Sequence, residues 1–235
     1  EPTLQGAGFC PVCIRPTIYR SFDTEDDWFN SYRCQDCESL PRDRAVQHLL
    51  DNLYPDWRTR SLHESSPCNE LLERESSDYS ASQYYTDRTL GDRVGKFRNE
   101  NLESMTFEDE RFDFVIALEV MEHVFHPDRV VREMFRCVRP GGAVIFTTCL
   151  GGWETSRPRA SQDPKTGEIS HLLEPVYHGN PIAEGALLTW DFGDDFPHLL
   201  QRWSGVEPIL WHEVNDRMGV PVGGAPWVWI LPKKG

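Results

Sequence analysis

Four cysteines near the N-terminus stand in two CxxC pairs, Cys10-Pro-Val-Cys13 and Cys34-Gln-Asp-Cys37. Two such pairs let two short turns converge on one ion, and four thiolates complete a tetrahedral zinc site that leaves no position open for catalysis. We therefore predict a structural zinc ion held by all four thiolates. A redox-active CxxC is the alternative, and it is disfavoured because neither pair is placed at the start of a helix that follows a strand.

The remaining three cysteines, Cys68, Cys137 and Cys149, are scattered and suggest no disulfide framework, so we expect a reducing compartment and a cytoplasmic protein. The chain has no run of about 18 apolar residues and does not begin like a signal peptide, so we expect no membrane partner. A net charge of -14 disfavours nucleic acid as a partner, because the average field repels polyanions. The oligomeric state stays open.

The elements that could position catalytic side chains centre on residues 111–148. Residues 113–118 and 143–148 are near-continuous apolar runs, which is typical of strands in a sheet covered on both faces. Between them we predict an amphipathic helix over 127–138 and a Pro-Gly-Gly turn at 140–142. This pattern predicts an α/β fold.

The rest of the chain suggests two domains. An apolar stripe predicts a helix that starts near Pro41, ends before Pro55 and docks a zinc module of residues 1–55 onto a larger domain of residues 56–235.

In that larger domain we expect strands at 60–64, 79–84 and 94–98, and a helix that begins with Ser66 as N-cap and Pro67 at its first position. Later elements are strands at 186–192, 207–213 and 227–231 and a helix at 197–203. Residues 151–185 lack a regular pattern, and we interpret them as a lid-like insertion.

Several motifs occur in a specific order: the two CxxC pairs, SLPRDR, LHESSP, NLE, EVMEHV, RPGG and YHGNP. In this order they resemble a poorly characterised group of zinc-bearing bacterial proteins with a class I S-adenosylmethionine-dependent methyltransferase domain of the type 11-like kind. The resemblance implies a Rossmann-like, doubly wound, mostly parallel sheet of seven strands that binds S-adenosylmethionine. One departure stands out, because LHESSP replaces the acid and the Gly-rich turn that usually approach the cofactor.

The resemblance also implies which residues contact the cofactor. LHESSP takes the place of the Gly-rich motif, and Gln83 replaces the acid that usually accepts hydrogen bonds from the ribose hydroxyls. The NLE segment matches the loop that commonly contacts adenine, and the end of the strand at 113–118 supplies a further wall. The predicted cofactor contacts are His63, Glu64, Ser65, Ser66, Gln83, Asn101, Leu102, Leu118 and Glu119.

Methyl transfer from a sulfonium to an alcohol requires alignment and removal of the acceptor proton, a task that suits histidine. The candidates are His178, in the insertion, and His123, shortly after Glu119. Tyr177 and Asn180 flank His178 and could bind the acceptor. For His123 a structural role is the stronger alternative, and for His178 and Asn180 loop structure competes evenly with a role at the acceptor.

We therefore predict methyl transfer from S-adenosylmethionine to a small-molecule or glycan acceptor, at oxygen. An alternative enzyme is an rRNA or tRNA methyltransferase, since such enzymes can carry zinc modules, although the charge of -14 argues against it. A second alternative is a binding protein that kept the fold and lost catalysis, which the altered Gly-rich motif allows. Neither the acceptor nor its reacting atom follows from the sequence.

Overall fold

The structure is a computed structural model that describes residues 3–22, 31–179, 185–221 and 227–235. The chain divides into two compact units, and each combines separate stretches of sequence. Unit 1 contains Glu1–Ser61, Asn69–Tyr79 and Leu210–Val228, and unit 2 contains Leu62–Cys68, Ser80–Ile209 and Trp229–Gly235. The division into domains at residue 55 stays a prediction.

Unit 1 is built on a small antiparallel sheet. Its strands β1 (Leu4–Cys10), β2 (Arg15–Ser21) and β3 (Arg33–Cys34) lie in the order β1-β2-β3, so each CxxC pair sits at the end of a strand. The helix predicted to start near Pro41 is confirmed as α2 (Pro41–Leu53), which buries its apolar stripe, including Ala45, Val46 and Leu49, while its docking role stays a prediction. Unit 1 also contains η1 (Trp57–Thr59), α3 (Leu71–Glu75) and η3 (Asp216–Met218).

The main sheet has eight strands in the order β16-β17-β9-β8-β4-β5-β7-β6, whereas seven were expected. Strands β4 and β9 both pair in parallel with β8, and β5 pairs in parallel with β7, as an α/β, Rossmann-like fold requires. The strands are β4 (Ser61–Ser65), β5 (Asp78–Gln83), β6 (Arg93–Val94), β7 (Phe97–Asn99), β8 (Phe112–Leu118), β9 (Val138–Thr147), β16 (Ile209–His212) and β17 (Trp227–Pro232).

The eighth strand arises where one strand was predicted at 94–98. Gly95 adopts φ +61° and reverses the chain, so residues 93–99 form the antiparallel hairpin β6–β7 instead. The helix expected to start at Ser66 is also wrong, because α3 begins only at Leu71. Ser66 has φ +54°, outside the extended conformation of an N-cap residue, and its backbone N–H donates to the Ser82 carbonyl on β5 (2.8 Å).

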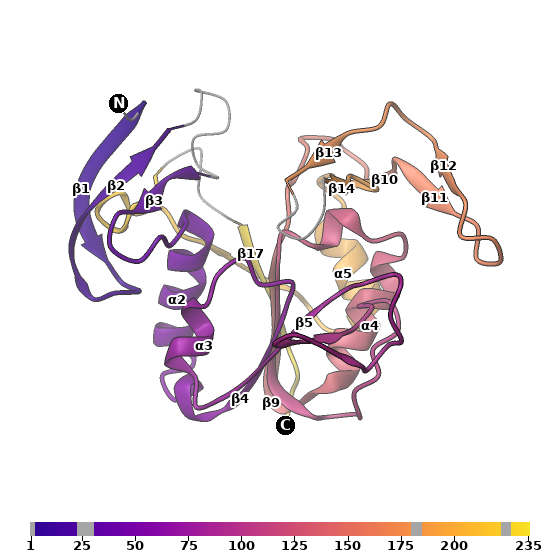
Figure 1. Cartoon of the computed structure of the whole chain (residues 1–235), viewed down its shortest axis with the longest axis horizontal. Helices are drawn as coiled ribbons and strands as arrows, with labels where there is room; N and C mark the ends of the chain where they lie inside the picture. Colours follow the sequence, from indigo (N-terminus) through magenta and orange to yellow (C-terminus); the bar gives the residue numbers. More distant parts are fainter. Residues whose placement is uncertain (1–2, 23–30, 180–184, 222–226) are drawn as a thin grey trace. The chain divides into compact units, whose positions relative to one another are not determined.

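Helices α4 (Pro127–Cys137) and α5 (Phe196–Ser204) pack together and cover the sheet within unit 2 (Figure 1). Val130, Val131 and Met134 of α4 are fully buried in one cluster with β8 and β9 side chains such as Val115 and Val144. The strand–helix–strand pattern predicted over 113–148 is therefore confirmed, although β9 begins at Val138 and includes the Pro-Gly-Gly segment.

The insertion contains four short strands where no regular structure was predicted. Strands β11 (Ala160–Gln162) and β12 (Ile169–His171) form a hairpin that extends away from the rest of unit 2 (Figure 1). Strands β10 (Arg157–Pro158) and β13 (Tyr177–His178) pair with β15 (Trp190–Asp191) and β14 (Ala186–Leu187), respectively. The strand predicted at 186–192 is thus two short strands, and the partner of β15 lies more than 30 residues earlier in the chain, beyond the reach of a local pattern.

Within the described residues, every helix is too short or too polar to cross a membrane.

Candidate functional site

The carboxyl ends of β4 and β8 carry two non-glycine residues in the left-handed region of backbone conformation. Ser66 follows β4 with φ +54°, and Glu119 follows β8 with φ +55°. The Glu119 N–H donates to both the carbonyl (3.2 Å) and the Oγ1 (3.1 Å) of Thr147 on β9, which holds the turn. Because such conformations are costly without glycine, the two turns at this sheet edge must be held in place by their surroundings.

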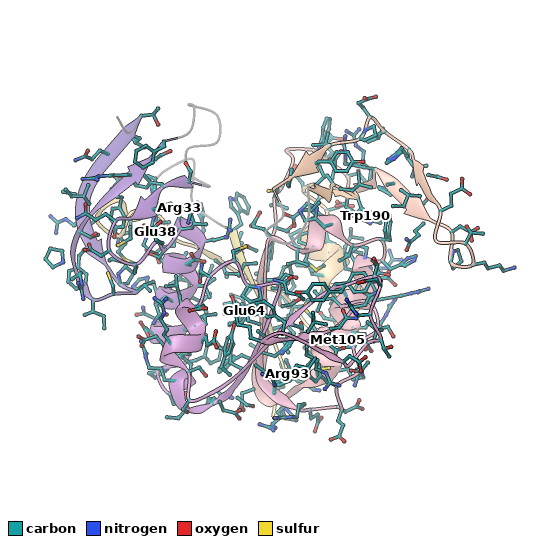
Figure 2. All side chains as sticks on the ribbon, viewed as in Figure 1. Arg33, Glu38, Glu64, Arg93, Met105 and Trp190 are labelled. Carbon is teal, nitrogen blue, oxygen red and sulfur yellow. The ribbon has the colours of Figure 1, made fainter. Side chains whose placement is uncertain are left out.

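Most of the predicted cofactor residues lie along this carboxyl edge. Glu64 and Ser65 end β4, and both are 5% exposed. Gln83 ends β5 and is 4% exposed, with its Nε2 placed 3.4 Å from the Pro67 carbonyl. Glu64 is marked in Figure 2. Parallel strands place their carboxyl ends together, so the edge brings these residues near Leu118 and Glu119.

The His63 side chain points into the protein core. Its ring is fully buried, stacks on Phe112 and meets Phe107 edge-on, while its two nitrogens bond to Ser80 Oγ (2.8 Å) and Ser82 Oγ (3.0 Å). Burial, with a smaller contribution from nearby arginines, lowers the pKa of His63 to about 3, so the ring is neutral. Only the backbone of His63 is left to serve the predicted cofactor contact.

The NLE segment follows β7 and joins the same edge. Asn101 uses its Oδ1 to accept the Glu103 N–H (2.9 Å), and Leu102 is 5% exposed in the core cluster of unit 2. Glu103 accepts the N–H groups of Phe125 (2.7 Å) and His126 (3.0 Å) through Oε1. Glu103 thereby fixes the predicted adenine loop to the segment that follows β8.

The two predicted catalytic histidines lie next to each other. The rings of His123, in η2 (Met121–His123), and His178, in β13, are 5.2 Å apart between centroids at an interplanar angle of 89°. His123 Nδ1 faces the Leu187 carbonyl at 2.9 Å, and since a carbonyl only accepts, Nδ1 carries the proton. His123 Nε2 is therefore an acceptor, and it lies 3.9 Å from Glu122 Oε1.

Glu122 completes this cluster and was not predicted. Its carboxyl is 1% exposed, with Oε2 accepting from Thr148 Oγ1 (2.8 Å) and Oε1 buried without a hydrogen-bond partner among the described residues. Burial, and then the neighbouring Glu119 charge, raise the pKa of Glu122 well above its ordinary value. Burial lowers the pKa of His123, so a neutral imidazole faces a carboxyl that favours its protonated form.

Thr189, four residues after the insertion, anchors the chain to this cluster. Its N–H (2.8 Å) and Oγ1 (3.0 Å) both donate to the Glu122 carbonyl, and Oγ1 also reaches the Val124 carbonyl at 2.6 Å. Trp190, marked in Figure 2, places its Nε1 3.3 Å from the Phe125 carbonyl. Asp191 accepts from both Arg157 (2.9 Å) and Arg159 (2.9 Å), which ties β10 to β15.

Of the two predicted acceptor-binding residues, Tyr177 is 62% exposed beside His178, and Asn180 lies outside the described residues. Glu122, Thr148 and Leu187 are contacts that the sequence interpretation missed. Glu122 belongs to the EVMEH motif, and an acid adjacent to His123 was the available signal. Thr148 and Leu187 become neighbours of the motif only through the sheet and the insertion.

The four N-terminal cysteines converge in unit 1. Their Sγ atoms all lie within 4.8 Å of one another, with 3.7 Å between Cys10 and Cys37 and 3.8 Å between Cys13 and Cys34. Thr17 Oγ1 lies 3.2 Å from Cys34 Sγ, and the Asp36 N–H donates to the same sulfur at 3.4 Å. A backbone N–H directed at a cysteine sulfur, as from Asp36, is typical of a metal knuckle.

Part of the chain that forms this sheet edge matches a known domain family. Residues 71–146 match a family described as a methyltransferase domain. This methyltransferase domain match includes the carboxyl ends of β5, β7 and β8 together with Glu122 and His123. It covers less than half of the chain, and His178 lies outside it.

Two curated relatives are named as a sterol methyltransferase and as a methyltransferase of ubiquinone biosynthesis. A sterol 24-C-methyltransferase from Schizosaccharomyces pombe is 29% identical over 64% of this chain and 34% of its own length. A ubiquinone biosynthesis O-methyltransferase from Pseudomonas entomophila is 43% identical over 47% of this chain and 40% of its own length. The chain thus spans less than half the length of these relatives.

Solved structures give a weaker likeness. Streptomyces venezuelae DesVI matches with a TM-score of 0.49 and 13% identity, over 82% of this chain and 90% of that chain. An S-adenosylmethionine dependent methyltransferase from Mesorhizobium loti matches with a TM-score of 0.47 and 14% identity, over 79% of this chain and 95% of that chain. Likeness at this level adds nothing to the domain match.

Proposed function

We propose that this protein is an S-adenosylmethionine-dependent methyltransferase that methylates a small-molecule or glycan acceptor at oxygen in the cytoplasm. The proposal rests on the methyltransferase domain match over residues 71–146. This matched region includes His123, whose ring contacts that of His178. Relatives named for methylation of a sterol and in ubiquinone biosynthesis support a small-molecule acceptor. The charge of -14 supports an acceptor other than nucleic acid.

The residues at the edge suit a cationic cofactor. S-adenosylmethionine carries a sulfonium and an ammonium group, and Glu64 and Glu119 place two carboxyl groups at the ends of β4 and β8. In the proposed site, the methionyl part of the cofactor is held by Glu64, Ser65 and Ser66. The ribose is held by Gln83, and the adenine is held by Asn101 and Leu102. Leu118 and Glu119 form a further wall of the cofactor site. When bound, the cofactor supplies the electrophilic methyl group.

The histidine pair performs the proton chemistry in this proposal. His178 accepts the hydroxyl proton of the acceptor as the oxygen is methylated, because an alcohol is a poor nucleophile while it holds that proton. His123 keeps one tautomer, since its Nδ1–H is held by the Leu187 carbonyl, and it orients the His178 ring from 5.2 Å. Tyr177 lies beside His178 in β13 and contacts the acceptor in this proposal.

We further propose that Cys10, Cys13, Cys34 and Cys37 hold a structural zinc ion. Two pairs of sulfur atoms separated by 3.7 and 3.8 Å are close to the edge of a zinc–sulfur tetrahedron, which is about 3.8 Å for bonds of about 2.3 Å. Zinc content measured by mass spectrometry on the purified full chain should approach one ion per chain. A zinc-free protein that is folded and stable would contradict this part of the proposal.

The decisive experiment for the activity is calorimetry with S-adenosylmethionine on the zinc-loaded chain. We expect binding with a Kd in the micromolar range, about -8 kcal/mol. A panel of phenolic, sterol and sugar hydroxyl compounds then identifies the acceptor through release of S-adenosylhomocysteine. Absence of binding would overturn the enzyme proposal in favour of a binding protein, and salt-sensitive RNA binding in a filter assay would favour an RNA methyltransferase.

A further inference from the structure

Arg44, in the first turn of α2, is a fully buried cation in unit 1. Its guanidinium has 0% exposure and lies 4.5 Å above the Tyr19 ring. The two terminal nitrogens donate to three backbone carbonyls, those of Ser39, Tyr32 (2.8 Å) and Gly219 (2.6 Å). Arginine stays protonated at any ordinary pH, so a full positive charge is buried here.

No carboxylate among the described residues accepts a hydrogen bond from this guanidinium. The Asp43 carboxylate is adjacent in sequence, but it accepts instead from the Leu40 N–H (2.8 Å) and from Asn69 Nδ2 (2.9 Å). Within the described part of the chain, Arg44 Nε has no hydrogen-bond partner either. The Asp43 charge acts on Arg44 only through space, and burying a charge without a closely paired counter-charge costs several kcal/mol, so a further negative group beside Arg44 would lower that cost.

The nearest candidates are the cysteine sulfur atoms. Arg44 donates to Ser39 Oγ (3.3 Å), and the same oxygen lies 3.5 Å from Cys10 Sγ and 3.3 Å from Cys37 Sγ. A zinc ion with four thiolates has a net charge of about -2, since one dication is surrounded by four anions. The guanidinium and this dianion would thus be separated by a single hydroxyl group.

We infer that Arg44 is the counter-ion of the four-cysteine metal site and positions Ser39 against two of its sulfur atoms. The inference rests on the zinc ion proposed above. It also gives Arg44 a second task, because the same guanidinium holds the Gly219 carbonyl of the turn that follows η3. The charge of the metal site thereby helps to hold the turn at Gly219 in unit 1.

A structural role alone makes a different prediction from a counter-ion role. If Arg44 serves only to satisfy three carbonyls, its forked geometry matters, and lysine should fail as badly as methionine. If Arg44 balances charge, lysine should preserve most of the zinc affinity and methionine should not. The charge role also predicts coupling, so that Arg44→Met reduces the stability of the zinc-loaded protein far more than that of the zinc-free protein.

The test uses the full chain with Arg44→Met, Arg44→Lys and the control Arg33→Met. Arg33 is an exposed cation beside Cys34, and its NH1 lies 3.4 Å from the Glu38 carbonyl, with both residues marked in Figure 2. Zinc affinity is measured by competition with a chromophoric chelator, and melting temperature is measured with and without zinc. We expect Arg44→Met to lose roughly tenfold or more in affinity, which is typical of residues that support metal ligands.

Arg44→Lys and Arg33→Met should remain within about threefold of the wild type, a smaller loss than that of a supporting residue. Equal losses for Arg44→Lys and Arg44→Met, or no loss for Arg44→Met, would overturn the inference. If Arg44→Met does not fold, Arg44→Gln serves as the uncharged variant with the same expectation. A wild-type protein that binds no zinc would instead refute the proposed metal site, so the two failures are distinguishable.

Discussion

At the scale of single residues, the hydrogen-bond partners of the ring nitrogens distinguish a structural histidine from the two proposed catalytic histidines. His63 has both ring nitrogens bonded to serines inside the core, whereas His123 and His178 meet at the sheet edge beside Glu122. Burial lowers the pKa of both His63 and His123, but only His123 has a nitrogen directed at the cluster. The functional assignment therefore depends on the partner of each nitrogen, which residue type alone does not reveal.

His178→Ala should lower kcat by roughly 100-fold on the acceptor found in the panel, because a positioned base contributes about 10²–10⁴ in rate. Affinity for S-adenosylmethionine, measured by calorimetry, should change by less than about twofold, since a base touches the acceptor and not the cofactor. His171→Ala, at an exposed histidine of β12, is the matched control and should leave kcat unchanged. Unchanged kcat for His178→Ala, or turnover that depends on added Mg²⁺, would argue against His178 as the base.

His63 should make the protein acid-labile. Its folded pKa of about 3 lies below the ordinary value, so the unfolded chain binds a proton that the folded chain does not. The resulting stability is present above about pH 6.5 and is lost as pH falls toward 3, by up to about 1.4 kcal/mol per pH unit. In urea unfolding between about pH 5 and 7, His63→Leu should show a shallower pH dependence than wild type or His171→Ala; an identical dependence would contradict the assignment.

At the scale of elements, the Pro-Gly-Gly segment has a role beyond a turn. Gly141 adopts φ +82° and donates its N–H to the Lys233 carbonyl (2.8 Å). Gly142 approaches β8 so closely that a Cβ would collide with the Asp113 carbonyl oxygen. The first glycine permits a backbone conformation, and the second permits contact between β8 and β9, the strands that position Glu119 and Thr148.

Gly142→Ala should therefore destabilise unit 2 more than Gly141→Ala does. A Cβ at Gly142 meets backbone that cannot move cheaply, which costs about 1–3 kcal/mol or more. A Cβ at Gly141 has nothing within 4 Å, so only the conformational cost of about 1–2 kcal/mol applies. Chemical denaturation of both variants measures the difference, and an equal or reversed order would show that β9 shifts to accommodate the side chain.

At the scale of the whole molecule, the two units have different proposed ligands. Unit 1 contains the cysteine cluster and Arg44, and unit 2 contains the carboxyl edge with Glu119 and the histidine pair. Binding stabilises the conformation that binds, and the effect is greatest in the elements that contact the ligand. Zinc and S-adenosylmethionine should accordingly protect different parts of the chain.

Hydrogen exchange read by mass spectrometry should resolve this difference. Zinc removal should increase exchange in β1–β3 and in residues 215–221, while S-adenosylmethionine should decrease exchange in residues 64–66, 101–103 and 119–123. The physical reason is that each set holds the groups that contact or support its own ligand. Exchange that rises equally in both units on zinc removal would indicate that the metal stabilises the whole chain instead of unit 1.

The sequence by itself determined the elements that local patterns encode: the β8–α4–β9 core with its apolar periodicity, helix α2, and the spacing of the four cysteines. Tertiary structure alone decided which distant groups meet. Glu122 lies close to His178, and the segment that follows the insertion is bonded to the Glu122 carbonyl through Thr189. Ser66 bonds to a carbonyl of β5 instead of starting a helix. Arg44 is buried, with Ser39 Oγ between its guanidinium and the cysteines. Such contacts arise from packing between segments far apart in sequence, which periodicity and propensity cannot encode.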